Sequence, residues 1–318
     1  MPSDSENQLC LHQARQEQLN ISAKYTQDFL SQINPDTDYE QSKCPTCDQA
    51  ASRPLFIKNN GRYCHCSSCD HVYLSNPLKQ ERLIEFYAGY PTSSLDWHRN
   101  ESEFYKSIYN KGLDLIGRLD NAAKVLDIGC SSGYFLKIAS ERGCEINGLE
   151  PNNLEASYAI EQGINILGQT IDDLPNRSDF SLITLWDVLE HIPDPVFYLK
   201  RLRSHLSPTG LVFVQVPTSD SLAARVLREA CNMFDGIEHL TLFGARSLDT
   251  AFGRAGFTLV DRHSVISESH ALRNYLSYEQ DPYMSTPEAP FTAEFLSPDS
   301  IENNGLGYKI QAVYRIQP

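Results

Sequence analysis

The sequence is poor in several features that would each have indicated a class of protein. Lys and Arg number 27 against 41 Asp and Glu, which gives a formal net charge of -14, and the basic residues form no stripe. Because nucleic-acid binders neutralise phosphates with clustered cations, this balance argues against nucleic acid and favours a small-molecule substrate. No run approaches the roughly 20 apolar residues that a membrane-spanning helix needs. The start of the chain is polar and lacks a basic then apolar leader, so we expect a cytoplasmic protein.

Cysteine is present in an odd number, nine, and five of the nine lie between Cys44 and Cys69. An odd count with C-x2-C pairs favours metal binding over disulfides. Cys44-Pro-Thr-Cys47 and Cys66-Ser-Ser-Cys69 have the spacing of two zinc knuckles that close a tetrahedral site. We therefore predict a structural Zn²⁺ held by Cys44, Cys47, Cys66 and Cys69, with Cys64, His65 and His71 as spare donors nearby.

The chain divides into four predicted parts. Residues 1–41 form a mobile or helical N-terminal segment, 42–75 a zinc-ribbon-like module, 76–120 a helical linker or cap, and 121–318 one α/β domain. From Lys124 onward short apolar strands alternate with amphipathic helices, which is typical of a mostly parallel sheet covered on both faces. The last two strands read as an antiparallel pair, and residues 268–306 between them have no assignment. The predicted strands are Lys124–Ile128, Glu145–Glu150, Asn165–Leu167, Phe180–Leu185, Leu211–Val216, Phe257–Val265 and Tyr308–Ile316.

A glycine-rich turn follows the first of these strands. Gly129 and Gly133 let the backbone approach a bound ligand closely. The third glycine of the dinucleotide fingerprint is missing, and Asp127 precedes the first one, so a cationic sulfonium ligand fits better than a pyrophosphate. Glu150 ends the next predicted strand, where a carboxylate can accept hydrogen bonds from ribose hydroxyls.

Four segments, in order and at the usual spacing, resemble the S-adenosylmethionine (SAM) motifs of class I methyltransferases: Val125–Leu136, Gly148–Pro151, Ile171–Pro175 and Phe180–Pro195. The resemblance implies a Rossmann-like, seven-stranded, mostly parallel sheet and a SAM-dependent methyltransferase. It also implies the cofactor contacts: Gly129 and its neighbours on the methionine part, Glu150 on the ribose, and Trp186 beside the sulfonium. The neighbours of Gly129 implied to contact the methionine part are Asp127, Cys130, Ser131 and Gly133. The residues implied to contact the adenine are Ile171 and Asp172.

Acidic residues and a histidine follow the fourth predicted strand, at the carboxyl end of the sheet where α/β folds bind ligands. A helix beginning at Asp187 would place Asp187, Glu190 and His191 on one face. His191 could then act as general base, or the three could hold a divalent cation that lowers a hydroxyl pKa. In a third interpretation they only brace the turn, and proximity drives the reaction. The stretch resembles ubiquinone-biosynthesis-type O-methyltransferases, in which this pattern is associated with divalent metal.

Residues 217–243 are expected to fold over the cofactor. His239 in this segment is a second candidate base, but a lone histidine in an apolar run is more often structural, so we favour His191. A zinc module ahead of such a domain resembles zinc-containing bacterial sugar methyltransferases. We expect O-methylation of a small-molecule or glycan-precursor acceptor. The alternatives are C-methylation of a sugar nucleotide, a zinc-ribbon RNA methyltransferase, and a SAM-binding protein without catalysis; the sequence names neither the acceptor nor the oligomeric state.

Overall fold

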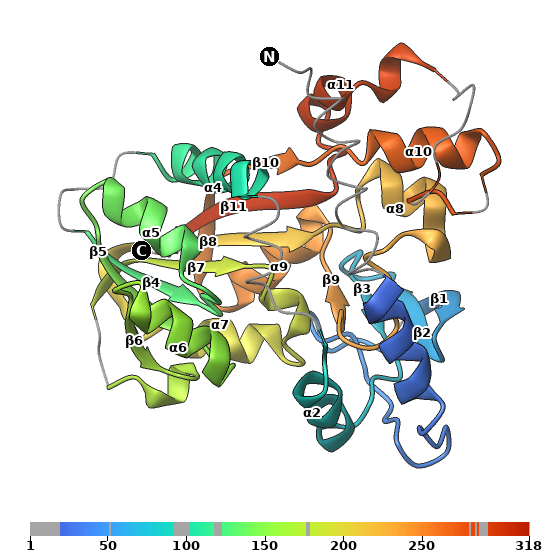
Figure 1. The fold of residues 1–318 in the computed structure, drawn as a ribbon, viewed down its shortest axis with the longest axis horizontal. Helices are drawn as coiled ribbons and strands as arrows, with labels where there is room; N and C mark the ends of the chain where they lie inside the picture. The colour runs from blue at the N-terminus through green and yellow to red at the C-terminus, as the bar shows by residue number, and fades with distance from the viewer. Residues whose placement is uncertain are drawn as a thin grey trace.

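The computed structural model describes residues 20–50, 52–91, 102–117, 123–175, 179–279, 281–283, 285 and 292–317. Parts of the predicted N-terminal segment (1–19) and linker (92–101 and 118–120) therefore lie outside the described residues. The described chain forms a seven-stranded sheet and a four-stranded sheet (Figure 1). The strands of the larger sheet are β4 (Lys124–Ile128), β5 (Glu145–Leu149), β6 (Asn165–Gly168), β7 (Phe180–Trp186), β8 (Leu206–Pro217), β10 (Phe257–Val265) and β11 (Lys309–Ile316).

The larger sheet has the order β10-β11-β8-β7-β4-β5-β6. The neighbouring strands β8, β7, β4, β5 and β6 run parallel to one another. Strand β11 runs antiparallel to both β8 and β10. The predicted fold class and the antiparallel final pair are confirmed. Strand β8 begins at Leu206, five residues before the predicted Leu211, because Phe180 pairs with Leu206 ahead of an irregularity in the β7 register.

Helices cover both faces of this sheet, as its alternating residues require. Val125 and Leu182 face a core shared with α4 (Ser102–Ile116) and α5 (Tyr134–Glu141). Their neighbours Leu126 and Ile183 face the opposite core, shared with α7 (Pro195–Arg203) and α9 (Ala245–Arg254). Helix α6 (Asn153–Glu161) contributes Ala159 to the first core. The result is a three-layer α/β domain. Open α/β sheets bind ligands at the carboxyl ends of their strands, which here are the ends of β4, β5 and β7.

The smaller sheet joins the cysteine-rich segment to a distant part of the chain. Its order is β1-β2-β3-β9, and β9 (Thr241–Leu242) pairs with β3 through Val72 and Leu242. The other three strands are β1 (Ser52–Lys58), β2 (Gly61–Cys66) and β3 (Val72–Leu74). The segment after β8, which was expected to fold over the cofactor, thus also completes the sheet of the cysteine module.

A third hydrophobic core lies beneath this smaller sheet. It takes buried side chains from the helical residues 20–30, from α2 (Gln80–Ala88), α8 (Leu222–Leu227) and α10 (Ser269–Leu276), and from α11 (Pro298–Asn303). The unassigned stretch 268–306 therefore contains α10, η4 (Glu294–Leu296) and α11, and α10 packs against α8 (Figure 1). Within the described ranges, no helix combines the length and apolar character required to cross a membrane.

Candidate active site

The glycine-rich turn joins β4 to α5 with three residues in the left-handed region: Gly129 (φ 67°), Ser131 (φ 51°) and Gly133 (φ 76°). A Cβ atom on Gly133 would lie 2.5 Å from Cγ1 of Ile164, and one on Gly129 would lie 2.9 Å from Cγ2 of Val188. Both glycines are therefore required by conformation and by space, since other residues rarely adopt such φ values. The turn brings the backbone to the edge of the sheet without side chains in the way.

Two buried carboxylates lie at this turn. Glu150 accepts hydrogen bonds from the backbone N–H of Ser131 (2.7 Å) and of Asn152 (2.8 Å), so it holds the turn to the end of β5. Asp127 accepts a hydrogen bond from the Thr184 hydroxyl at 2.6 Å. Burial raises the pKa of Asp127 to about 8 and that of Glu150 to about 7, despite the hydrogen bonds that oppose this. A cationic ligand would offset the cost of ionising both groups.

The remaining predicted cofactor residues occupy three different environments. Cys130 is buried under the turn, where its Sγ packs against Gly148. Ile171 is buried at the start of η1 (Ile171–Asp173), and the exposed Asp172 forms an ion pair with Arg201. Its neighbour Asp173 instead accepts hydrogen bonds from the backbone N–H groups of residues 169 and 170, at 2.8 and 2.9 Å, so it caps η1.

Trp186, at the end of β7, lies in an aromatic cluster on the α4 side of the sheet. Its ring centroid is 4.7 Å from that of Tyr109, 5.0 Å from Phe135 and 4.3 Å from Phe213. Gly112 of α4 allows this approach, because a Cβ atom there would lie 2.4 Å from the indole. The indole thus packs β7 and β8 against α4.

Asp187 does not open a helix, so the predicted common face of Asp187, Glu190 and His191 is wrong. Its φ is 55°, and its backbone N–H continues the sheet by donating to Gln215 O at 3.0 Å. The short 3-10 helix η2 (Leu189–His191) begins two residues later. The Asp187 carboxylate accepts hydrogen bonds from Lys309 Nζ at 2.5 Å and from Gln215 Nε2 at 2.9 Å. Neighbouring strands therefore hold Asp187 in place.

Glu190 and His191 meet His239 instead of Asp187. One ligand atom from each of these three residues lies within 4.8 Å of the others. Glu190 is only 1% exposed, and neither of its carboxylate oxygens has a hydrogen-bond partner among the described residues. Burial, together with the charge of Asp187, raises the pKa of Glu190 to about 8. A desolvated carboxylate with no partner is costly, and such groups concentrate at functional sites.

The pKa values of the two histidines in this cluster are shifted in opposite directions. Burial lowers the pKa of His239, but the charge and hydrogen bond of Asp235, 2.7 Å from Nδ1, outweigh burial and raise that pKa to about 10. Burial and the nearby positive charge of His239 lower the pKa of His191 to about 4. The ring centroids are 5.0 Å apart. At neutral pH His191 is therefore neutral and His239 protonated.

The tautomer of His191 follows from its neighbours. Nδ1 lies 3.1 Å from the Glu238 carbonyl oxygen, which can only accept, and 3.1 Å from the Tyr87 hydroxyl. Nδ1 therefore carries the proton, and Nε2 keeps a lone pair. His191 and Tyr87 line a pocket of about 350 Å³ whose walls include Leu83 and Leu240. Sequence reasoning missed Asp235; its position four residues before His239 was the available signal.

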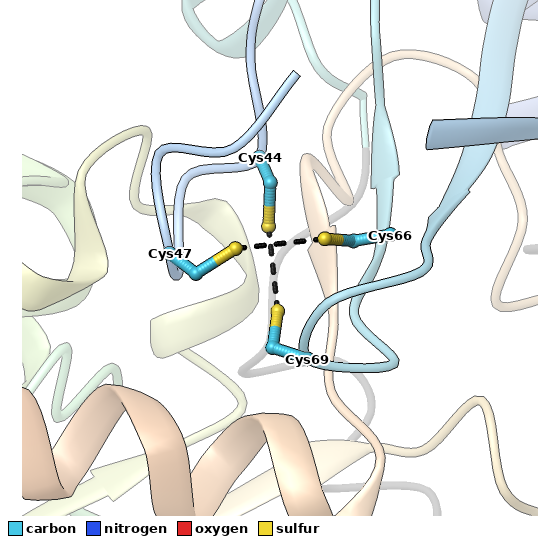
Figure 2. Close-up of side chains that lie close together, drawn as sticks. All are labelled: Cys44, Cys47, Cys66 and Cys69. Atoms are coloured by element: carbon cyan, nitrogen blue, oxygen red, sulfur yellow. Dashed lines mark hydrogen bonds between the residues drawn. The ribbon is translucent and has the colours of Figure 1, made fainter. Parts of the chain in front are cut away.

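The four predicted zinc ligands converge on one point (Figure 2). The Sγ atoms of Cys44 and Cys69 are 3.6 Å apart, and those of Cys47 and Cys66 are 3.5 Å apart. A tetrahedral zinc with Zn–S bonds of about 2.3 Å needs sulfur pairs about 3.8 Å apart, so the geometry fits this ion. Cys64 is buried beside the quartet but does not belong to it.

Residues 97–262, more than half of the chain, match the family model described as "Methyltransferase domain". Together with the sheet order and the turn, this match shows that the chain belongs to the class I SAM-dependent methyltransferases. It is an enzyme of that family, and SAM is its cofactor.

Among curated proteins, the chain is similar to the ubiquinone biosynthesis O-methyltransferase of Haemophilus ducreyi, with 30% identity over 35% of this chain and 50% of that protein. The enzyme of the same name from Colwellia psychrerythraea is 30% identical over 28% of this chain and 40% of that protein. The chain thus spans half or less of the length of these two relatives.

Solved structures give weaker matches. A SAM-dependent methyltransferase of Thermotoga maritima, described as a possible histamine N-methyltransferase, aligns with TM-score 0.46 and 18% identity over 68% of this chain and 94% of that one. A putative sarcosine dimethylglycine methyltransferase of Galdieria sulphuraria aligns with TM-score 0.48 and 16% identity over 69% of this chain and 88% of that one.

Proposed function

We propose that this methyltransferase acts on a hydroxyl oxygen of a small-molecule or glycan-precursor acceptor. We also propose that His191 removes the proton of that hydroxyl and that His239 stabilises the negative charge on the oxygen. The observation that carries the proposal is the pair of opposite pKa shifts in two adjacent imidazoles, about 4 and about 10. Paired titratable groups whose environments separate their pKa values are the mark of acid and base roles. The O-methyltransferase relatives support oxygen as the acceptor atom.

Each histidine takes a defined part. His191 is neutral with a free Nε2 lone pair, so it accepts the proton of the acceptor hydroxyl. His239 donates Nδ1–H to the Met233 carbonyl oxygen and is kept protonated by the Asp235 carboxylate, 2.7 Å from Nδ1. Its positive charge stabilises negative charge that develops on the acceptor oxygen. Bound SAM supplies the electrophilic methyl group. Asp127, Gly129, Cys130, Ser131, Gly133, Glu150, Ile171, Asp172 and Trp186 are proposed to surround that cofactor.

A divalent cation is a second way for the same cluster to work. Glu190 offers two unpartnered buried oxygens, and His191 and His239 offer ring nitrogens within 4.8 Å. Two histidines and one carboxylate form a donor set that suits divalent transition metals, so the residues fit such an ion. A cation bound there would lower the pKa of an acceptor hydroxyl. Asp187 lies outside this group of three residues, and Lys309 and Gln215 both donate to its Oδ2.

Zinc at the cysteine quartet is proposed to be structural. Four thiolates fill a tetrahedral ion and leave no open position for catalysis. The Arg254 guanidinium of α9 donates to the Thr46 carbonyl oxygen between two of the ligands, so the knuckle is anchored to the methyltransferase domain. A filled quartet would therefore fix the cysteine module against the domain that carries the histidine cluster.

The test combines product identification with histidine variants. Labelled SAM is incubated with a metabolite extract, and the product is expected to carry a methoxy group; a carbon-bound methyl group would contradict O-methylation. His191→Gln should lower kcat roughly 10²- to 10⁴-fold at unchanged SAM affinity. His239→Gln should remove the alkaline limb of the pH-rate profile. His263→Gln, on β10, is the matched control and should turn over normally.

Two results would reject the roles of the cluster. Full turnover by His191→Gln across the pH range would remove the base. The second result is activity that a chelator abolishes and added Mn²⁺ or Mg²⁺ restores in the wild type but not in Glu190→Gln. It would favour the cation over the two-histidine mechanism.

A further inference from the structure

A second cavity lies away from the histidine cluster, between the cysteine module and the segment that follows β8. It has a volume of about 660 Å³ and is bounded by β1 on one side and by α8 and η3 (Arg228–Ala230) on the other. The Arg228 guanidinium bridges the two sides by donating to the Leu55 carbonyl oxygen at 3.3 Å. We call this cavity the arginine groove.

Cations gather in the groove although the protein as a whole is strongly acidic. Four arginines line it, against two carboxylates, Asp70 and Asp220. This is unexpected in a chain with a formal net charge of -14. The four arginines come from β1, α8, η3 and α9, so only the folded chain brings them together: Arg53, Arg225, Arg228 and Arg246.

Two of the arginines are held in place by the groove's own carboxylates and still face solvent. Arg246 pairs with Asp70 at 2.6 Å and is 65% exposed. Arg225 pairs with Asp220 at 2.9 Å and is 61% exposed. A guanidinium has five N–H donors in a rigid fork, so each of these side chains retains donors for a ligand. The ion pairs orient the two forks, which keep N–H donors free although the charge of each pair is balanced.

The other two arginines differ in their partners. The Arg228 guanidinium lies 5.9 Å from the centroid of the Phe56 ring and 3.7 Å from the Glu229 carboxylate. Arg53 forms no ion pair within the described part of the chain. Three of the four arginines thus have an acidic partner, and Arg53 leaves the groove with one positive charge in excess, which a bound anion would offset.

We propose that the arginine groove binds the phosphate or diphosphate group of a small ligand. Arginine forks match the oxygens of phosphate in bidentate geometry, and such charge-assisted hydrogen bonds are the strong ones. The volume of the cavity falls within the range of small-molecule sites, roughly 300–1,000 Å³. The ligand would contact both the cysteine module and the segment that follows β8, which also carries His239. This site stands independently of which atom accepts the methyl group.

Calorimetric titration of the whole chain with inorganic pyrophosphate and with uridine diphosphate, at constant ionic strength, tests the site. The double variant Arg53→Gln, Arg228→Gln should weaken binding at least about tenfold, since each removes one charged contact. Arg62→Gln, on β2 and outside the groove, matches each single substitution in its change of charge and should bind like the wild type. Neither variant alters the histidine cluster, so the result does not depend on methyl transfer.

Three outcomes would overturn the proposal. The first is no binding of either anion up to millimolar concentration. The second is equal weakening by Arg62→Gln and by the double variant, which would mean that the general electrostatic field and not the groove attracts the anion. The third is salt-dependent binding of RNA that pyrophosphate does not displace, which would assign the groove to nucleic acid.

Discussion

Replacing Asp127 by asparagine should stabilise the cofactor-free enzyme, and increasingly so as the pH rises. The pKa of this buried carboxyl is raised from 3.8 to about 8. A group whose pKa is raised on folding costs stability as pH increases from the unfolded value to the folded one. At pH 7 the cost is about 4 kcal/mol, from about 1.36 kcal/mol per pH unit. Asparagine keeps the oxygen that accepts the Thr184 hydroxyl but removes this cost.

The expected size of the effect is limited by the new amide. A buried N–H group without a partner costs about 1–3 kcal/mol, so the net gain at pH 7 is about 1–3 kcal/mol. The amide cost does not vary with pH. The difference in unfolding free energy between Asp127→Asn and wild type should therefore grow by about 3–4 kcal/mol between pH 5 and pH 8.

Urea denaturation of both proteins without SAM, at pH 5, 6, 7 and 8, measures this difference. Asp114→Asn is the matched control, because the Asp114 side chain is 74% exposed and pairs with Arg142 at the surface. Its effect should stay within about 0.5 kcal/mol at every pH. A difference for Asp127→Asn that is constant across this range would refute the argument that burial holds this carboxyl protonated.

The same carboxyl should couple cofactor binding to proton release. At pH 7 a group with a pKa of about 8 is about 90% protonated, and the cationic ligand requires it ionised. SAM binding should therefore release about 0.9 proton from Asp127, measured by calorimetry in two buffers of different ionisation enthalpy. The Asp127→Asn variant should release fewer protons by this amount and bind SAM more weakly; unchanged release would contradict the coupling.

Two further predictions concern the turn and the cysteine quartet. Gly133→Ala should destabilise the protein and weaken SAM binding more than Gly163→Ala does, since both glycines have positive φ but only Gly133 lies against a side chain, Ile164. Thermal unfolding and SAM titration of both variants measure this, and equal effects would contradict the steric argument. The wild type and Cys64→Ser should each contain about one zinc per chain, whereas Cys69→Ser should lose the metal and part of its thermal stability. Metal analysis decides, and zinc retained by Cys69→Ser would contradict the proposed ligand set.

Much of the fold was predictable because the evidence for it is local in sequence. A strand that is buried on both faces needs a short continuous apolar run, and the glycines of a tight turn must follow directly after it. Strands β4 and β10 accordingly begin and end where predicted. The four cysteines were predictable for the same reason, since the spacing within each knuckle already suits one tetrahedral ion.

The histidine cluster depended on contacts that no local pattern contains. Predicting a helix at Asp187 failed because its backbone N–H continues the sheet by donating to Gln215 O, on a strand formed later in the chain. The preference for His191 over His239 treated the latter as an isolated histidine. Folding places it beside Glu190 and makes Asp235 its partner.

The local clustering of positive charge was the property least predictable from the sequence. The basic residues form no stripe along the sequence, but Arg225, Arg228 and Arg246 join Arg53 once β9 completes the smaller sheet. The sequence by itself determined most strands of the larger sheet, the turn, the grouping of the four cysteines and the methyltransferase class, because each depends on neighbours within a few residues or on repeated spacing. Only the tertiary structure decided which acids, histidines and arginines face each other, because electrostatic and hydrogen-bonding partners are chosen by distance in space.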